Sequence, residues 1–304
     1  MLNRNFITGK QSSFNAAMDF AACYVSLAPV RAEPSHKSEM VSQLLFGETV
    51  EIHEEKASWR HVVCAWDGYT GWVHSSQLKR LTPGEFEAYA EHQSTNLSLV
   101  EGLMASDHFI PLTFGAVLPG FDGLRCRLGD ESYQFSGSVV NSNQVKPTGE
   151  WIVKLARRYL HAPYLWGGRS PFGIDCSGLT QMVYKIAGIR LLRDAYQQVT
   201  QGRPVDFTEQ CQNGDLAFFD NGKGHIGHVG IVLSDCHIIH ATGKVRIDRF
   251  DHFGIFNVDK NRYSHQLRII KRLLPDESGA DEGVQEAQAG QEDSSQFALF
   301  DGMG

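Results

Sequence analysis

The chain of 304 residues lacks any apolar run approaching the roughly 20 residues that a membrane-spanning helix needs. Its apolar start has no separated basic region and is interrupted by Asp19, so we expect no signal peptide. The formal net charge of −7 argues against a protein held to nucleic acid by phosphate contacts. The sequence therefore predicts no membrane span and no nucleic-acid partner, and it leaves the oligomeric state open.

Basic residues are missing from one region, residues 275–304, which holds eight of the 35 acidic residues and no Lys or Arg. The rest of the chain has 28 basic and 27 acidic residues and is nearly neutral. Because a mixture of Gly, Glu, Gln, Ala and Ser buries little apolar surface, we expect an acidic, disordered tail over 275–304. Within it, residues 297–300 (FALF) form a segment able to dock elsewhere.

The chain also lacks cysteines at CxxC spacing; its six cysteines are spread out. A chain of this length buries enough apolar surface to fold without disulfides. No HExxH-like metal motif occurs. His225 with His228, and His237 with His240, are each three residues apart, which on a strand points the two rings to opposite faces. We expect no metal and no cofactor, with His225 and His237 facing solvent.

Short alternating segments separated by turn signals fill the first part of the chain, with candidate strands at 49–53, 59–63 and 71–74. This pattern predicts a small barrel over residues 1–81. A pair of Gly-plus-apolar segments recurs further on at similar spacing, which predicts a second, diverged module over 82–148. Residues 83–103 are more helical in composition and are expected to link the two modules.

The pattern changes at residues 147–149. Apolar side chains on one helical face predict a helix over 150–160, capped by Thr148 or Gly149. A Gly-rich loop leads to a second expected helix, which begins after Cys176 and stops at Gly188. Candidate strands then follow at 215–219, 227–233 and 237–241, and the apolar run 268–274 ends the folded part. Helices first and strands later predict an α+β domain over 149–274.

A nucleophilic cysteine is favoured where a helix N-terminus stabilises its thiolate, and Cys176 is expected at such a junction. The alternative is a loop cysteine packed under Trp166. His228 and His240 are twelve residues apart, with Ser234 midway, so a hairpin closing there puts both rings on one sheet face. Cys176 as nucleophile, His228 as base and His240 as the group orienting it form an activated Cys–His pair.

Two aromatic residues precede the nucleophile in the sequence. Tyr164 is a candidate phenol near the oxyanion, and Trp166 is a candidate wall of the substrate site. Aromatic packing in the domain core is the alternative for both.

Four short motifs carry a resemblance to a known family: PYLWGG at 163–168, DCSGL at 175–179, GHVGI at 227–231 and IHA at 239–241. In order and spacing, residues 150–274 resemble the NlpC-type cell-wall cysteine peptidases. The resemblance implies a reduced papain-like α+β fold with a Cys–His–His triad at Cys176, His228 and His240. It also implies hydrolysis of γ-D-glutamyl bonds to a diamino acid in peptidoglycan stem peptides.

The N-terminal part resembles bacterial SH3-like modules through VRAEP at 30–34, GETV at 47–50 and DGYTGWV at 67–73. We therefore expect two small all-β SH3-like barrels before the papain-like domain. That arrangement is similar to the γ-D-glutamyl-L-diamino acid endopeptidases of the dipeptidyl-peptidase VI type, whose first module helps to close the active site. The resemblance implies a small murein peptide as partner, with a free N-terminal L-Ala, and release of L-Ala-D-Glu.

A free ammonium in a closed subsite must meet carboxylates and acceptors, or its desolvation is uncompensated. By similarity, substrate contacts are expected from Glu33, Tyr69, Asp175, Ser177 and Asp194. A surface turn, barrel packing and a helix N-cap are the alternative roles of Glu33, Tyr69 and Asp194. The subgroup often has a small hydroxyl residue soon after the Arg-Asp pair, where this chain has Ala195 and Tyr196.

Two other functions stay open from the sequence: a wall-binding protein that works through its SH3-like modules, and acyl transfer by the same Cys–His pair to an amine. Cytoplasmic recycling of wall peptides is the expected setting, with an exported, envelope-associated enzyme as the alternative. The preference between diaminopimelate and lysine is not predicted.

Overall fold

The computed structural model describes residues 19–91, 93–220 and 222–275, and the described residues up to Leu274 belong to one compact unit. The tail predicted to be disordered, including the segment 297–300, lies outside the described residues apart from Pro275. Within the described part, no helix has the length and apolar character needed to cross a membrane.

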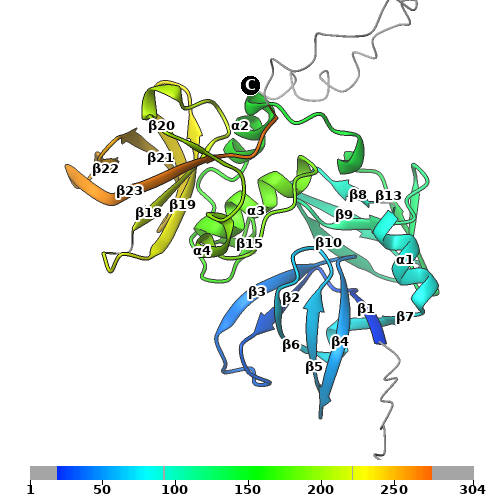
Figure 1. Cartoon of the computed structure of the whole chain (residues 1–304). Coiled ribbons are helices and arrows are strands. Elements are labelled where there is room, and N and C mark those ends of the chain that lie inside the picture. The colour runs from blue at the N-terminus through cyan, green and yellow to red at the C-terminus, as the bar shows by residue number, and fades with distance from the viewer. Residues whose placement is uncertain (1–18, 92, 221, 276–304) are drawn as a thin grey trace, which may run out of the picture. The chain divides into compact units, whose positions relative to one another are not determined.

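The first part of the chain is an all-β barrel-like module, built on a seven-stranded sheet of order β3-β2-β6-β5-β4-β1-β7 (Figure 1, blue). Its small core is made of aliphatic side chains such as Val30, Val50 and Val62. The strands predicted at 49–53, 59–63 and 71–74 are confirmed as β4, β5 and β6. The strands are β1 (Asp19–Cys23), β2 (Leu27–Arg31), β3 (Met40–Leu45), β4 (Thr49–Lys56), β5 (Trp59–Cys64), β6 (Thr70–His74) and β7 (Leu78–Leu81).

A helix and a second group of strands follow. The helical composition predicted for 83–103 is confirmed only for α1 (Pro83–Glu91); from Gln93 onward the chain is strand, because pairing with distant strands overrides local preference. The sheets have orders β10-β9-β13-β12 and β11-β8-β14. That these strands are a second SH3-like copy stays a prediction. Their bounds are β8 (Gln93–Asn96), β9 (Val100–Met104), β10 (Phe109–Thr113), β11 (Val117–Pro119), β12 (Arg125–Leu128), β13 (Glu131–Phe135) and β14 (Val139–Asn141).

The third part begins with its helices, as the sequence predicts. The Thr148 hydroxyl accepts a hydrogen bond from the backbone N–H of Trp151 at 3.2 Å and caps α2 (Gly149–Arg157). The short strands β15 (Arg169–Ser170) and β16 (Gly173–Ile174) lead into α3 (Cys176–Ile186). Gly188, at φ +76°, follows α3 and lets the chain turn away. A one-turn helix, α4 (Ala195–Gln198), comes next.

The strands of this part form a sheet of order β17-β23-β18-β19-β20-β21-β22, and β22 also pairs with β23. That last pairing closes six antiparallel strands on one another, while α3 packs against β19 and β20 (Figure 1). The strands at 215–219, 227–233 and 237–241 are confirmed, whereas β21 and β22 were not predicted. The bounds are β17 (Arg203–Val205), β18 (Leu216–Asp220), β19 (Ile226–Leu233), β20 (His237–Thr242), β21 (Lys244–Asp251), β22 (Gly254–Asn257) and β23 (Arg262–Arg272).

Candidate active site

Cys176 is the first residue of α3, and the residue before it fixes this end of the helix. Asp175 is the N-cap: its Oδ1 accepts the N–H of Gly178 at 2.6 Å, and its Oδ2 accepts the N–H of Gly167 at 2.8 Å. Arg193 donates to both carboxylate oxygens, at 3.1 and 2.7 Å. Asp175 therefore holds the Gly-rich loop, the helix start and Arg193 together, although it also lines the cavity beside Cys176.

The thiol of Cys176 is 8% exposed, and burial raises its pKa to about 12. The negative charge of Asp175 adds to this shift, while backbone hydrogen bonds of Val229 and Ser177 and the charge of Arg193 oppose it. Burial of the sulfur thus opposes the stabilisation of a thiolate that the helix N-terminus provides. Cys176 is a thiol at neutral pH and needs a base to become a nucleophile.

His228 and His240 are brought together by the β19–β20 hairpin, with a register that differs from the predicted one. His240 pairs with Gly230, not with His228, because the turn is centred on Asp235 instead of Ser234. The two histidines share a face nonetheless, since Gly230 and His228 are two residues apart on one strand. A Cβ on Gly230 would lie 3.0 Å from the Cβ of His240 and 2.7 Å from Ile238, so this position requires a glycine.

The two imidazoles are joined directly. Nε2 of His228 lies 2.8 Å from Nδ1 of His240, and Nε2 of His240 lies 3.1 Å from Oδ2 of Asp248 on β21. Arg246 donates to the other oxygen of Asp248 at 2.7 Å, and the two hydrogen bonds outweigh burial and lower the pKa of this carboxyl. Asp248 is 2% exposed, and motif reasoning missed it because its strand was not predicted.

The charge of Asp248 settles which nitrogen carries each proton. An ionised carboxylate only accepts, so Nε2 of His240 carries a hydrogen and its Nδ1 accepts from Nε2–H of His228. Nδ1 of His228 is then an unprotonated acceptor. Burial, with a contribution from His240, lowers the pKa of His228 well below 6.5, so the ring is neutral and able to accept a proton.

His265 on β23 is a second residue that sequence reasoning missed. Its ring stacks on His228, with centroids 4.1 Å apart and planes 20° apart, and burial lowers its pKa to about 4. Facing nitrogens of His228, His240 and His265 lie within 4.8 Å of one another, close enough to hold a metal ion. Two of these nitrogens already bond each other, so a metal would have to break the His228–His240 contact. Of the other histidines, His225 is exposed and His237 is half-buried.

A cavity of about 200 Å³ lies beside the thiol, between the first module and the third part of the chain. Tyr69 of the first module donates to Oδ2 of Asp194 at 3.2 Å, and burial raises the pKa of that half-buried carboxyl. Tyr196 also hydrogen-bonds Asp194, so the residue that departs from the subgroup pattern is part of this wall. The lining is Glu39, Val41, Tyr69, Tyr164, Trp166, Asp175, Cys176, Ser177, Asp194, Ala195, Tyr196, Ile226 and Gly227.

Seven of the residues predicted from the sequence meet at this cavity: Tyr69, Tyr164, Trp166, Asp175, Cys176, Ser177 and Asp194. Glu33 is not among them; it is exposed, its backbone N–H donates to the hydroxyl of Ser38, and its carbonyl oxygen accepts from the N–H of Ser35. Glu39, six residues further on, lines the cavity and accepts a hydrogen bond from Nε1 of Trp166 at 2.6 Å. The sequence offered no motif that separated Glu39 from its exposed neighbours.

The first module is fixed to the third part by buried charges. Glu48 accepts from Arg169 of β15 at 2.8 and 2.9 Å and from Lys185 of α3 at 2.6 Å, and all three side chains are buried. Gly167, at φ +74°, passes so close to Met40 of β3 that a Cβ would lie 2.3 Å from its carbonyl oxygen. The cavity wall formed by the first module is therefore held rigidly against Cys176.

Comparison with known proteins agrees with this geometry. The model of the NlpC/P60 family matches residues 161–266, and that of the bacterial dipeptidyl-peptidase Sh3 domain matches residues 30–78. The chain is 33% identical over 252 residues to the Gamma-D-glutamyl-L-lysine dipeptidyl-peptidase of Bacillus subtilis (strain 168), covering 77% of this chain and 81% of that protein. It is 29% identical to the Dipeptidyl-peptidase 6 of Lysinibacillus sphaericus, covering 71% and 85%.

The fold has a counterpart among solved structures. The crystal structure of a NlpC/P60 family protein from Bacillus cereus ATCC 10987 matches with a TM-score of 0.72 at 24% identity, covering 84% of this chain and all of that one. Fold and site together define a cysteine peptidase with an N-terminal SH3-like module. The chain belongs to the NlpC/P60 family.

Proposed function

We propose that the enzyme hydrolyses the bond between the γ-carboxyl group of D-Glu and a diamino acid, L-Lys or meso-diaminopimelate, in murein peptides with a free N-terminal L-Ala. The product is L-Ala-D-Glu. One observation carries the proposal: the cavity of about 200 Å³ holds Cys176 together with the carboxylates of Asp194 and Glu39. A small cavity lined by these two acids suits a dipeptide that ends in an ammonium group. The names of the Bacillus subtilis and Lysinibacillus sphaericus relatives support it.

Recognition of the amino terminus follows from desolvation. An ammonium group moved from water into this cavity loses hydration, and charge-assisted hydrogen bonds must replace it. Asp194 with the hydroxyl of Tyr69 offers such acceptors, and Glu39 adds a second carboxylate to the lining of the same cavity. An N-acetylated peptide has no ammonium group. Its binding would remove water from the carboxylates of Asp194 and Glu39 without supplying a positive charge in return.

The chemical step uses the unprotonated Nδ1 of His228. As the sulfur of Cys176 attacks the γ-carbonyl carbon, its proton passes to Nδ1 of His228, and His228 then delivers that proton to the leaving amine. Water then attacks the thioester carbon while His228 takes a proton from it, the C–S bond breaks, and His228 returns the proton to the sulfur of Cys176. Burial raises the pKa of Tyr164 to about 12, so its phenol stays protonated and can donate to the oxyanion.

We further propose that the reaction belongs to the cytoplasmic recycling of small peptides released from the wall. A requirement for a free amino terminus favours such fragments over stem peptides, whose amino end is attached to the glycan. Cell fractionation distinguishes this setting from an exported, envelope-associated enzyme.

Mass spectrometry of the products tests the function. L-Ala-γ-D-Glu-L-Lys and its meso-diaminopimelate counterpart are incubated with the enzyme, each with a free and with an acetylated amino terminus. We expect L-Ala-D-Glu from the free peptides, little product from the acetylated ones and none with Cys176→Ala. Equal rates on free and acetylated peptides would overturn the recognition proposed here, and a product joined to an added amine would indicate acyl transfer.

A further inference from the structure

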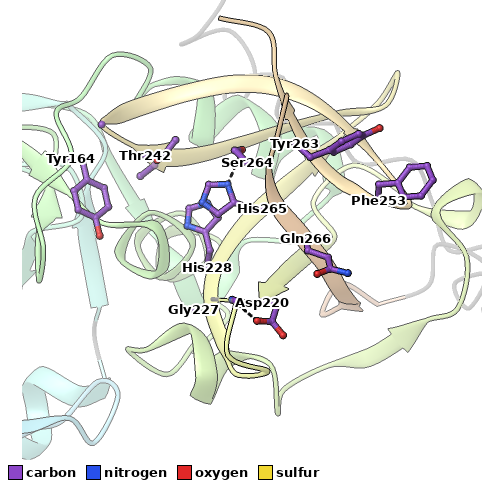
Figure 2. Close-up of a pocket in the computed structure, with 13 residues that line it drawn as sticks. Tyr164, Asp220, Gly227, His228, Thr242, Phe253, Tyr263, Ser264, His265 and Gln266 are labelled. Atoms are coloured by element: carbon purple, nitrogen blue, oxygen red, sulfur yellow. Dashed lines mark hydrogen bonds between the residues drawn. The ribbon is translucent and has the colours of Figure 1, made fainter. Parts of the chain in front are cut away.

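A second, larger cavity of about 870 Å³ is lined by His228 (Figure 2). This volume lies in the range of about 300–1,000 Å³ that is usual for small-molecule sites. The cavity shares Tyr164 and Gly227 with the smaller cavity, so the two adjoin at these residues. Its remaining lining is Asp220, Gly222, His228, Ala241, Thr242, Gly243, Phe253, Tyr263, Ser264, His265 and Gln266.

The positions of Cys176 and His228 indicate which half of a substrate each cavity takes, provided that the proposed function holds. The acyl half stays bonded to the sulfur of Cys176, which lines the smaller cavity. The leaving amine takes its proton from His228, which lines the larger one. The larger cavity is therefore the site of the diamino acid.

The lining of the larger cavity carries a net negative charge. Asp220 is its one carboxylate, and no Lys or Arg occurs among the lining residues that the structure describes. His228 and His265 do not offset it, because burial lowers the pKa of both rings and keeps them neutral. Oδ1 of Asp220 accepts the N–H groups of Gly222 and Gly224 at 2.5 and 3.0 Å, which fixes the carboxylate at the base of its loop. Figure 2 shows Asp220 beside Gly227, on the strand end next to His228.

We propose that Asp220 binds the side-chain ammonium group of the diamino acid and so selects a cationic leaving group. L-Lys and meso-diaminopimelate share this group, whereas an uncharged side chain of the same length lacks it. The larger cavity thus selects for charge at the end of the side chain, while its volume leaves room for residues that follow the diamino acid.

The test combines one change in the enzyme with one change in the substrate. L-Ala-γ-D-Glu-L-Lys is compared with the same peptide acetylated at Nε of the lysine, for the unmodified enzyme and for Asp220→Asn. We expect the unmodified enzyme to prefer the charged peptide about tenfold in kcat/KM, the size of one charge-assisted hydrogen bond, and Asp220→Asn to lose that preference. Retained cleavage of the acetylated peptide shows that the variant is folded.

Asp235→Asn is the matched control, since Asp235 lies in the β19–β20 turn at φ +62°, a conformation that Asn tolerates. This variant removes a carboxylate outside the cavity and should keep the full preference. A preference that survives in Asp220→Asn, or equal rates of the unmodified enzyme on both peptides, overturns the inference and leaves the proposed function intact. Cleavage of neither peptide overturns both. The meso-diaminopimelate peptide, assayed in parallel, identifies which diamino acid is preferred.

Discussion

Asp248 accepts a hydrogen bond from Nε2 of His240 at 3.1 Å, and both side chains are buried. Through this bond a residue that does not reach the substrate determines where the protons of two imidazoles lie. Its effect ends at Nδ1 of His228, the nitrogen that we propose takes the proton of Cys176. Asp248 is then a fourth, positioning residue of the proposed Cys–His–His arrangement.

Asp248→Asn should reverse this order of protons. Arg246 donates to one oxygen of Asp248, so the amide oxygen of Asn would keep that partner and its NH₂ would face His240. His240 would then carry its hydrogen on Nδ1, and Nδ1 of His228 would become a donor. We expect kcat to fall by about 10²- to 10⁴-fold with KM little changed, as for loss of a general base.

The control for that variant is Asp259→Asn. Asp259 pairs with the same Arg246 at 2.8 Å, but its side chain is 72% exposed and it does not contact His240. Steady-state kinetics should show nearly normal kcat for this variant. An Asp248→Asn enzyme with unchanged kcat would contradict the assignment of hydrogens to Nε2 of His240 and Nε2 of His228.

The pH dependence of kcat/KM should reflect a neutral Cys–His pair. Burial lowers the pKa of His228, so the base is lost only when the pH falls through a value below 6.5. On the alkaline side, activity should decline as the substrate's amino group loses its proton, near pH 8. A profile measured between pH 4 and 9 checks both limbs. An acidic midpoint at or above 6.5 would contradict the burial argument.

Asp194→Asn should weaken recognition of the amino terminus and leave the chemistry intact. The variant keeps the shape of the side chain but loses its charge beside Tyr69. We expect kcat/KM for the free peptide to fall by about 10- to 100-fold, the cost of one hydrogen bond to a charged group. The slow rate on the N-acetylated peptide should change little. Equal losses on both peptides would indicate a structural role.

Glu39 is the acid that the structure places in the cavity, and Glu33 is the acid inferred from the sequence motif; their variants test which of the two contacts the substrate. Both residues are exposed, but Glu39 lines the cavity of Cys176 and Glu33 does not. We expect Glu39→Gln to lower kcat/KM for the free peptide more than Glu33→Gln does. The opposite order, measured under identical conditions, would restore the role inferred for Glu33 from its motif.

Glu48→Gln should separate stability from activity. Burial alone would raise the pKa of Glu48, but Arg169 and Lys185 outweigh it and hold this pKa at about 2. Because an unfolded Glu titrates near 4.5, the group contributes stability above that pH and loses it as the pH falls toward 2. Removing its charge leaves two buried cations unpaired and should cost about 3–5 kcal/mol in the free energy of unfolding.

Urea denaturation at neutral pH measures that loss, with Glu54→Gln as the control. Glu54 lies on the same strand, β4, and is exposed, so its replacement should change the free energy of unfolding little. Lys185 works against the effect, since burial lowers its own pKa. A Glu48→Gln protein as stable as the control would contradict the role of this cluster.

The sequence by itself determined the local features of this enzyme. Alternation of apolar residues predicted β4, β5 and β6, and the face containing Ile152 and Leu155 predicted α2, because these patterns depend only on near neighbours. The motif around Cys176 and the spacing of His228 and His240 supplied the candidate reacting groups. The hairpin centre was predicted one residue too early, at Ser234 instead of Asp235. This shifts the pairing by two residues, so His228 and His240 stay on the same face of the sheet, as predicted.

The tertiary structure decided whatever depends on distant segments. Asp248 meets His240 through the pairing of β21 with β20, and His265 lies beside His228 because β23 pairs with β18, the neighbour of β19. Burial, a property of the whole fold, raises the pKa of Cys176 against the effect of the helix N-terminus. Glu39 and Asp220 look like ordinary surface acids in the sequence. They become candidate parts of the site only because the packing of the first module places Glu39 in the cavity lined by Cys176, and the end of β18 places Asp220 in the cavity lined by His228.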